Sequence, residues 1–229
     1  MRGGQQCVRD FFVLLNENLL NWPDVYSLFS FSIVSSTTCS RCKAISSSET
    51  TQIYEEVEVP PNDSTLSEIV ENLFNGSSTV HTSCNDGCKV PGEAMKRTTL
   101  KSTQDSQFII LIFSRAVDSG QGYQLLSNNI VSTGNINIRY GKFIMRFMMI
   151  FFFFRDFQGM DATYKAVSVL EFRGSINSSG ESQGHYICDV QDKSTTAWFR
   201  TNDNSFPISI NQDQVSKKAY VVLLKRSNE

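Results

Sequence analysis

Phe108-Ile109-Ile110-Leu111-Ile112-Phe113 is an unbroken apolar run, and a run of this length predicts a strand that is buried on both faces. Working outward, alternating or apolar stretches predict further strands at residues 29–33, 54–59, 164–172, 185–190 and 219–224. These strands do not alternate regularly with helices. The sequence therefore predicts an α+β fold and not a series of βαβ units.

Two helices are expected, both in the N-terminal half. Apolar side chains recur at steps of three and four over residues 5–20 and would form one buried stripe: Val8, Phe11, Phe12, Leu15 and Leu19. Trp22-Pro23 is expected to end this helix. The second helix covers the apolar residues of 66–74; Thr65-Leu66-Ser67-Glu68 fits a capping box at its start and Asn75-Gly76 a stop at its end.

The composition is that of an ordinary globular chain. The 229 residues are 40% hydrophobic and 19% charged, which excludes fibrous, collagen-like and fully disordered proteins. Lys and Arg number 21 and Asp and Glu 23, so the net charge is −2. Because no block of like charge stands out, the sequence argues against nucleic acid and against an anionic membrane as partners.

The N-terminal residues show no apolar signal-peptide region and no small-residue cleavage site, so an intracellular protein of the cytoplasm or the nucleus is expected. In a reducing compartment the six cysteines are expected to be free, catalytic or metal-bound and not paired as disulfides.

Residues 142–158 hold 7 of the 17 Phe residues and follow neither a helical nor a strand period. The longest uncharged run within them, at 147–154, has eight residues and is too short for a membrane span, which needs about 20. A core strand would have to bury Arg146 and point successive Phe rings to both faces. Since Phe codons are pyrimidine-rich, our leading hypothesis is a translated intron end, with Phe157-Gln158 encodable as TTT-CAG.

Two close cysteine pairs could hold a metal ion. Cys39-Ser40-Arg41-Cys42 lies in a Ser/Thr-rich stretch that we expect to be a turn, and Cys84-Asn85-Asp86-Gly87-Cys88 lies in a second polar stretch. Two such turns can close a tetrahedral Zn²⁺ site that crosslinks weakly packed strands. The alternative is four unrelated buried cysteines. A catalytic zinc is not expected, because four Cys ligands leave no open position.

His185, one of the two histidines of the chain, begins the strand predicted at 185–190, in Gly184-His185-Tyr186. Asn202 and Asp203 follow on the next predicted segment. A His oriented by Asn or Asp is half of a Cys-His-Asn/Asp nucleophilic site. The alternative is a surface or packing histidine.

Taken together, these motifs resemble the ubiquitin-specific protease family, the papain-like cysteine deubiquitinases. Gln5-Gln6-Cys7-Val8-Arg9-Asp10-Phe11-Phe12 is similar to the family's Gln-Gln-Asp-x-x-Glu-Phe-Leu helix, with Cys7 where the family has Asp. The cysteine pairs resemble its zinc ribbon, and residues 108–115 resemble the strand before its His box. Residues 164–170, 184–186, 198–203 and 219–226 then follow the family's order.

The resemblance implies thiol-dependent hydrolysis of (iso)peptide bonds at the C-terminal glycine of ubiquitin, with His185 as general base, Asn202 as its orienting partner and Asp203 assisting. It implies a papain-like fold with a thumb-helix remnant at 1–24, fingers with a zinc ribbon at 25–107, and a palm at 108–229 in which 142–158 is a non-native insertion. Ubiquitin or ubiquitinated proteins are the implied partners, and structural Zn²⁺ on Cys39, Cys42, Cys84 and Cys88 the implied cofactor.

The family's nucleophilic cysteine lies well N-terminal of the Gln-Gln helix, and this sequence starts after that position. We therefore expect a truncated gene model whose chain is inactive alone, with most of the thumb missing and the stripe on residues 5–20 exposed. Cys7 and Cys188 are poor substitutes; Cys188 is expected on the strand face opposite to His185. The alternatives are an inactive ubiquitin-binding scaffold and an autonomous zinc-ribbon module.

Overall fold

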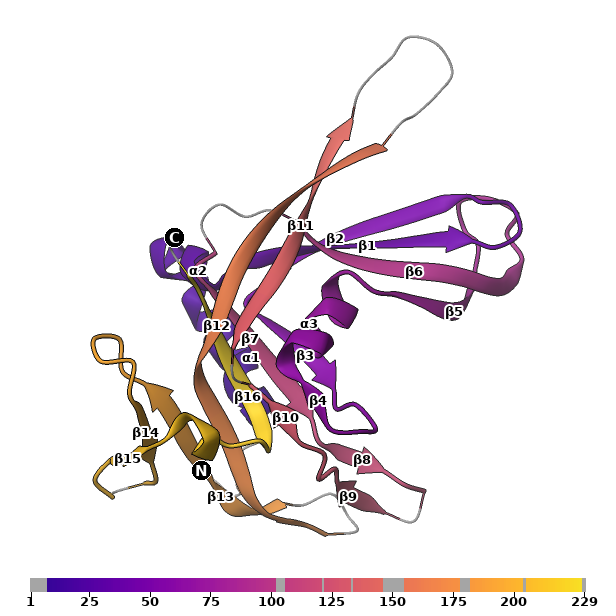
Figure 1. Cartoon of the computed structure of the whole chain (residues 1–229). Coiled ribbons are helices and arrows are strands. Elements are labelled where there is room, and N and C mark those ends of the chain that lie inside the picture. The colour runs from indigo at the N-terminus through magenta and orange to yellow at the C-terminus, as the bar shows by residue number, and fades with distance from the viewer. Residues whose placement is uncertain are drawn as a thin grey trace.

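The structure is a computed structural model that describes residues 8–101, 106–120, 122–132, 134–145, 155–177, 182–203 and 205–227. Side chains are described outside residues 139–161 and 181–182. Strands dominate the described part, as the α+β prediction requires, and the helices lie mainly in the N-terminal third (Figure 1). They are α1 (Val8–Leu19), α2 (Pro23–Phe29), α3 (Leu66–Phe74) and the 3₁₀ helix η1 (Gln212–Gln214).

Among the described residues, twelve strands form one large sheet, with a path that runs β15-β14-β13-β12-β11-β6-β1-β2 and four further strands attached to it. The path strands in chain order are β1 (Phe31–Cys39), β2 (Ile45–Gln52), β6 (Pro91–Lys101), β11 (Asn135–Met145), β12 (Arg155–Ile176), β13 (Ser182–Gln191), β14 (Trp198–Thr201) and β15 (Ile208–Ile210). The attached strands are β3 (Tyr54–Glu58), β5 (Ser77–Ser83), β7 (Phe108–Ser114) and β16 (Ala219–Arg226).

Two small two-stranded sheets complete the described part. They pair β4 (Ser64–Thr65) with β10 (Ile130–Val131), and β8 (Ala116–Asp118) with β9 (Tyr123–Leu125).

Strand β7 is buried on both faces, as its apolar run predicts. Ile109, Leu111 and Phe113 join the main core, which α3 covers. Ile110 and Ile112 point the other way, into a second cluster that contains Val8 of α1. The sheet body is therefore sandwiched between α3 on one face and α1 on the other.

The capping box at the start of α3 is confirmed. The backbone N–H of Glu68 donates to Oγ1 of Thr65 at 3.2 Å, and the N–H of Thr65 donates to Oε2 of Glu68 at 2.8 Å. Asn75 caps the other end, where the sequence predicts the stop.

Two expectations near the N-terminus were wrong. Pro23 does not only follow the end of α1 but begins α2, because its fixed φ and missing N–H suit the first helical turn. Phe29 therefore belongs to a helix and not to the strand predicted at 29–33. The apolar stripe on α1, which we expect to be exposed in this chain, is exposed in part: Val8 is buried, but Phe11 is 55% exposed.

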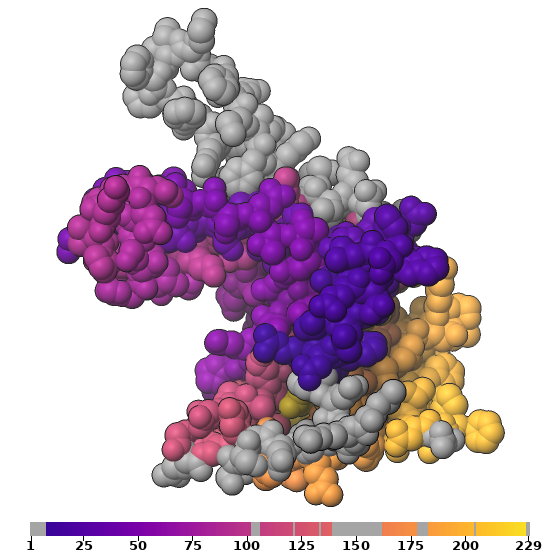
Figure 2. Space-filling model, turned by 180° about the vertical axis from the view of Figure 1, so that it is seen from behind, coloured from indigo at the N-terminus to yellow at the C-terminus, as the bar shows by residue number. Residues whose placement is uncertain are grey.

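The Ser/Thr-rich stretch that was expected to be a turn is mostly strand: β1 and β2 take up its two sides, and the turn is confined to the cysteine pair at residues 40–42. β1 and β2 form one hairpin, β5 and β6 form another, and β1 pairs with β6, so the four strands make a sheet in the order β2-β1-β6-β5. We call this four-stranded sheet the arm. It projects from the body in both views (Figures 1 and 2). Thr favours strands, and here that preference prevails over the turn composition.

Residues 142–158 follow no strand period in the sequence, yet their two ends pair with each other as strands. Lys142 to Met145 pair with Arg155 to Gln158 in the antiparallel β11–β12 ladder. Backbone hydrogen bonding between the two strands places residues 142–145 and 155–158 in the ladder, and backbone pairing leaves no pattern in the sequence. Residues 146–154 lie outside the described residues, and the intron origin stays a prediction.

Candidate metal centre and candidate active-site strands

The four predicted metal ligands meet at the tip of the arm. Cys39 and Cys42 lie where the β1–β2 hairpin turns, and Cys84 and Cys88 lie where the β5–β6 hairpin turns. All four Sγ atoms lie within 4.8 Å of one another. The pairs across the two turns are 3.9 Å (Cys39–Cys88) and 3.5 Å (Cys42–Cys84) apart. The four cysteines therefore form one cluster that could bind a metal ion.

The two turns have the same backbone geometry. In each, the residue after the second cysteine is left-handed, with φ of 60° at Lys43 and 57° at Lys89. In each, the N–H of that residue donates to the carbonyl of the first cysteine, at 3.1 Å for Lys43 to Cys39 and 2.9 Å for Lys89 to Cys84. The extra residue in the second pair therefore does not disturb the geometry that presents its thiols.

The space around the cluster fits four close sulfurs, and the backbone around it favours the thiolate at Cys42 but not at Cys84. A Cβ on Gly87 would lie 2.5 Å from Sγ of Cys42 and 3.0 Å from Sγ of Cys84, so only glycine fits beside the sulfurs. Backbone N–H groups of Ala44 and Cys88 lower the pKa of the Cys42 thiol to about 6, whereas burial raises the pKa of Cys84 to about 11. Metal–sulfur bonds of about 2.3 Å in a tetrahedron separate sulfurs by about 3.8 Å, close to the observed pairs.

His185 lies near the start of β13, directly opposite Arg173 of β12, and its side chain is exposed. The neighbouring pair Gly174–Gly184 is a close backbone crossing: a Cβ on Gly184 would lie 2.2 Å from the carbonyl oxygen of Arg173. The ring of Phe172 covers both glycines and packs against Tyr186, with ring centroids 5.1 Å apart. The backbone on both sides of His185 is thus held by packing.

Asn202 and Asp203 follow β14 and are both exposed; Asp203 has a φ of 45°. The β13–β14 ladder ends at the pair Cys188–Thr201. Continuing this register by one residue sets Asn202 opposite Ile187, two residues from His185. On this extended register Asn202, which lies one residue beyond the end of β14, falls on the same side of β13 as His185.

Cys188 is not placed as a nucleophile for His185. Cys188 is three residues from His185 and so lies on the opposite face of β13, as predicted. Its Sγ is 3.2 Å from Oγ of Ser168, and burial raises the pKa of the thiol, which disfavours the thiolate. Cys7 lies outside the described residues.

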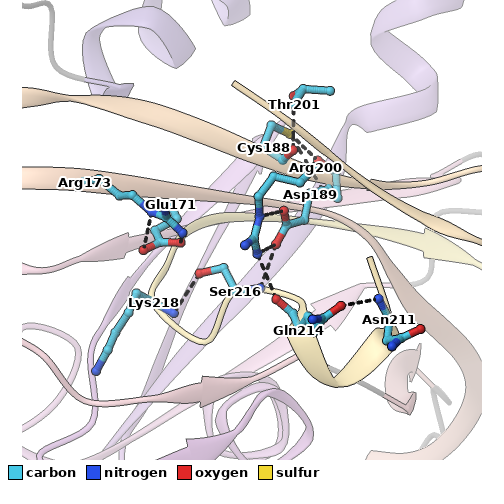
Figure 3. A network of polar contacts seen from close by, with 11 residues as sticks. Glu171, Arg173, Cys188, Asp189, Arg200, Thr201, Asn211, Gln214, Ser216 and Lys218 are labelled. Carbon is cyan, nitrogen blue, oxygen red and sulfur yellow. Dashed lines mark hydrogen bonds and ion pairs between the residues drawn. The ribbon is translucent and has the colours of Figure 1, made fainter. Parts of the chain in front are cut away.

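A buried ion pair beside these residues was missed by sequence reasoning. Asp189 of β13 is fully buried and accepts two hydrogen bonds from Arg200 of β14, at 2.7 and 2.8 Å (Figure 3). It also accepts the backbone N–H of Ser216 at 2.7 Å, and Arg200 donates to the carbonyl of Gln214 at 2.8 Å. The network joins β13, β14 and the segment before β16. One signal could have found Asp189: side chains alternate along β13, so Asp189 lies on the same buried strand face as Ile187.

A second missed residue is Arg115, which directly follows β7 and is buried. Its guanidinium donates to the carbonyls of Ala219, Leu126 and Asn128, at 2.6, 3.0 and 3.0 Å. Burial lowers its pKa. Arg115 therefore links three segments that are distant in sequence, and its place after the apolar run was the only signal for it.

These features define a papain-like fold: an α+β body that bears a cysteine-tipped arm, with His185 on β13 and Asn202 directly after the neighbouring strand β14. Residues 15–224 match the family described as "Ubiquitin carboxyl-terminal hydrolase". The chain belongs to this family.

Two solved structures with a similar fold and one curated relative match the chain. The SAGA DUB module of Ubp8, Sgf11, Sus1 and Sgf73 bound to monoubiquitin matches with a TM-score of 0.72 at 17% identity, over 98% of this chain and 49% of that chain. The same module bound to ubiquitin aldehyde matches with a TM-score of 0.72 at 17% identity, over 98% and 50%. "Ubiquitin hydrolase B" of Dictyostelium discoideum is 34% identical over 65 residues, 28% of this chain and 14% of that protein. The chain spans about half the length of the solved chains it matches.

No helix in the part of the chain that the structure describes is long and apolar enough to cross a membrane.

Proposed function

We propose that this chain is the arm-bearing part of a cysteine-type deubiquitinase, an intracellular thiol protease of the ubiquitin conjugation pathway that hydrolyses (iso)peptide bonds at the C-terminal glycine of ubiquitin. The observation that carries the proposal is the family match over residues 15–224. The extended β13–β14 register, which sets Asn202 two residues from the level of His185, supports the roles proposed for these two residues. The arm would be the fingers (25–107), the large-sheet body the palm (108–229), and α1 a helix of the thumb (1–24).

In the proposed reaction His185 takes the proton of a cysteine thiol, and the thiolate attacks the carbonyl carbon of the ubiquitin glycine. The protonated imidazole then gives its proton to the departing lysine amine, which leaves a thioester. A water molecule, deprotonated by His185, hydrolyses the thioester and releases the ubiquitin carboxylate. Asn202 holds the imidazole in the required tautomer, with Asp203 beside it.

The nucleophile is not among the described cysteines. Four form the cluster on the arm, and Cys188 faces away from His185. We propose that the whole gene product supplies the nucleophile from a segment before the Gln-Gln helix. This observation also favours a second candidate for the chain as printed, a catalytically inactive ubiquitin-binding scaffold.

We propose that the cluster of Cys39, Cys42, Cys84 and Cys88 holds a structural Zn²⁺. What supports zinc is the donor set, since four thiolates in a tetrahedral arrangement suit this ion and leave no position open for catalysis. Zinc would crosslink the two hairpins of the arm, which otherwise meet through β1 and β6.

Transcript sequence upstream of Met1 tests the first candidate against the second. If a cysteine segment is encoded there, the full-length protein should cleave ubiquitin-aminomethylcoumarin, and His185→Ala should lower kcat by about 10²–10⁴-fold. His81→Ala is the matched control, because His81 is the other histidine and lies on the arm. Equal losses from both variants would contradict the assigned role of His185. Ubiquitin binding without any turnover would favour the scaffold.

A further inference from the structure

The residue directly opposite His185 across the β12–β13 pair is a cation, Arg173. Directly opposed residues have Cβ atoms about 4.5–5.5 Å apart and lie on one face of the sheet, so the two side chains are neighbours. His185 is exposed, and the side chain of Arg173 is 48% exposed. A molecule that reaches the imidazole of His185 therefore also comes close to the guanidinium of Arg173.

Glu171, two residues before Arg173 on β12, is the ion-pair partner of Arg173 (Figure 3). Its carboxylate accepts from Nε at 3.3 Å and from Nη2 at 3.4 Å. Charge-assisted N–H···O bonds are usually about 2.7–2.9 Å long, so this pair is loose. Within the described residues, Nη1 of Arg173 donates to no acceptor. Arg200 on the same face is bound to the buried Asp189 at 2.7 and 2.8 Å, so of these two guanidiniums Arg173 is the one that can still take a partner.

The charged groups around Glu171 leave one cation in excess. Burial lowers the pKa of Arg115, and the charge of Glu171 partly opposes this. Asp189 raises the pKa of Arg200, and the charge of Glu171 adds to this rise. In this group two carboxylates are therefore shared among three guanidiniums. Because Arg115 is buried and Arg200 mostly so, the excess charge faces solvent at Arg173.

The reaction proposed for His185 sets the departing protein on the Arg173 side of the imidazole. Asn202 would hold one ring nitrogen from the side of β14, so the other ring nitrogen, which moves the proton, would face away from β14. β12 lies on that side, because β13 pairs with β14 along one edge and with β12 along the other. The lysine amine that takes the proton from His185 therefore leaves beside Arg173, together with the residues next to that lysine.

We propose that Arg173 is a specificity-determining residue, which favours conjugated proteins that carry Asp or Glu next to the modified lysine. The inference rests on the function proposed for His185 and names the class of conjugate that the same site prefers. The acidic side chain of the conjugate pairs with the guanidinium of Arg173 as the lysine enters beside His185. Because the pair is exposed, its effect is modest and is screened by salt.

The test uses the full-length gene product and two conjugates, in which ubiquitin is joined by an isopeptide bond to the lysine of a fluorescent peptide. The lysine is flanked by Glu in one peptide and by Gln in the other. We expect kcat/KM to be about two- to fivefold higher for the Glu peptide at low salt. This ratio should fall toward one at roughly 0.5 M salt. Equal values for the two peptides at low salt would overturn the proposal.

Matched variants assign the preference to Arg173. Arg173→Gln should abolish it, Arg173→Glu should reverse it and Arg173→Lys should retain it, since a loss of overall activity cancels in the ratio. Lys165→Glu is the control, because Lys165 is an exposed cation on the same strand, eight residues from Arg173, and it should keep the preference. A preference that survives in Arg173→Gln, or one that Lys165→Glu also loses, would contradict the role of Arg173.

Failure of the proposed function gives a different result. A wild-type protein that cleaves neither the conjugates nor ubiquitin-aminomethylcoumarin would contradict the reaction at His185. Fluorescence anisotropy of the two intact conjugates with the chain as printed then decides the role of Arg173. Tighter binding of the Glu peptide that Arg173→Gln abolishes would support the preference, and equal Kd values for the two peptides would overturn it.

Discussion

Arg200 and Asp189 join the two strands that hold the proposed catalytic residues. Asp189 lies on β13, four residues after His185, and Arg200 lies on β14, two residues before Asn202. The carboxylate is fully buried and the guanidinium mostly so, with two hydrogen bonds of 2.7 and 2.8 Å between them. Their hydrogen bonds raise the pKa of Arg200. The relative position of His185 and Asn202 therefore depends on this pair.

We expect Asp189→Ala to lower the free energy of unfolding by about 3–5 kcal/mol. The substitution leaves Arg200 without its counter-charge and the N–H of Ser216 without its acceptor, and breaking one side of a buried pair has a cost of this size. Urea denaturation followed by tryptophan fluorescence measures the loss, since Trp198 is the first residue of β14.

Lys101→Ala is the control for Asp189→Ala. It breaks the Lys101–Glu49 pair, which has a similar distance of 2.8 Å but side chains that are 48% and 45% exposed. An exposed pair contributes less than about 1 kcal/mol. If both variants lost the same free energy, Asp189 would not be the structural link described here.

The elements with strong local signals could be predicted from sequence. The Phe108–Phe113 run gave a doubly buried strand, and the Thr65–Glu68 spacing gave a helix start with its cap. The Ser/Thr-rich strands of the arm could not, because β2 and β5 are exposed on both faces and the burial of β1 shows no alternation. Their conformation is decided by pairing with each other, as at Thr37 and Lys96, and pairing is not visible in one strand's sequence.

The candidate sites also divide into a part that local spacing predicts and a part that depends on strand pairing. Spacing within each turn gave Cys39 with Cys42 and Cys84 with Cys88, and the structure brings the two pairs together. Asp189 and Arg200 are far from any motif and meet through the register of β13 and β14. Contacts that depend on register require the fold to be known first, which is why sequence reasoning missed this pair.

Gly87→Ala should weaken metal binding at the cluster by at least tenfold. The new Cβ would lie 2.5 Å from Sγ of Cys42 and 2.7 Å from Cβ of Ala44, so a ligand or the turn has to move. Zinc content after dialysis and competition with a chromogenic chelator measure the change, with about one zinc per chain expected for the wild type.

Gly92→Ala is the control for Gly87→Ala, because a Cβ at Gly92 meets nothing within 4 Å. It lies on the same arm, so a general loss of arm stability from added Cβ atoms would appear in both variants. Undiminished zinc affinity in Gly87→Ala would show that the sulfurs do not bind the ion in the geometry described.

Glu68 makes the stability of α3 depend on pH. The backbone N–H of Thr65, and then its hydroxyl, lower the pKa of Glu68 from its usual 4.5. Because the folded pKa is the lower one, the stabilisation is complete above the unfolded pKa and is lost as pH falls through the folded pKa. Glu68→Gln should therefore have a lower melting temperature than the wild type at about pH 7, and the difference should shrink as the pH falls below 4.5. A difference that stays constant over this range would contradict the role of the charge.

We predict that the chain self-associates through the outer surface of α1 and of the segment that leads into α2. Four large apolar side chains within twelve residues are more than half exposed: Phe11 (55%), Leu14 (52%), Leu20 (58%) and Trp22 (67%). Figure 2 shows this part of the chain on the outer surface of the molecule. Contiguous apolar surface of this kind drives association, so we expect aggregates at roughly tens of micromolar in sedimentation velocity. Leu14→Gln combined with Trp22→Gln should shift the chain toward monomer, whereas Phe206→Gln should not, because Phe206 is 93% exposed but lies in the loop before β15. A wild-type chain that remains monomeric at that concentration would show that this surface is tolerated in water.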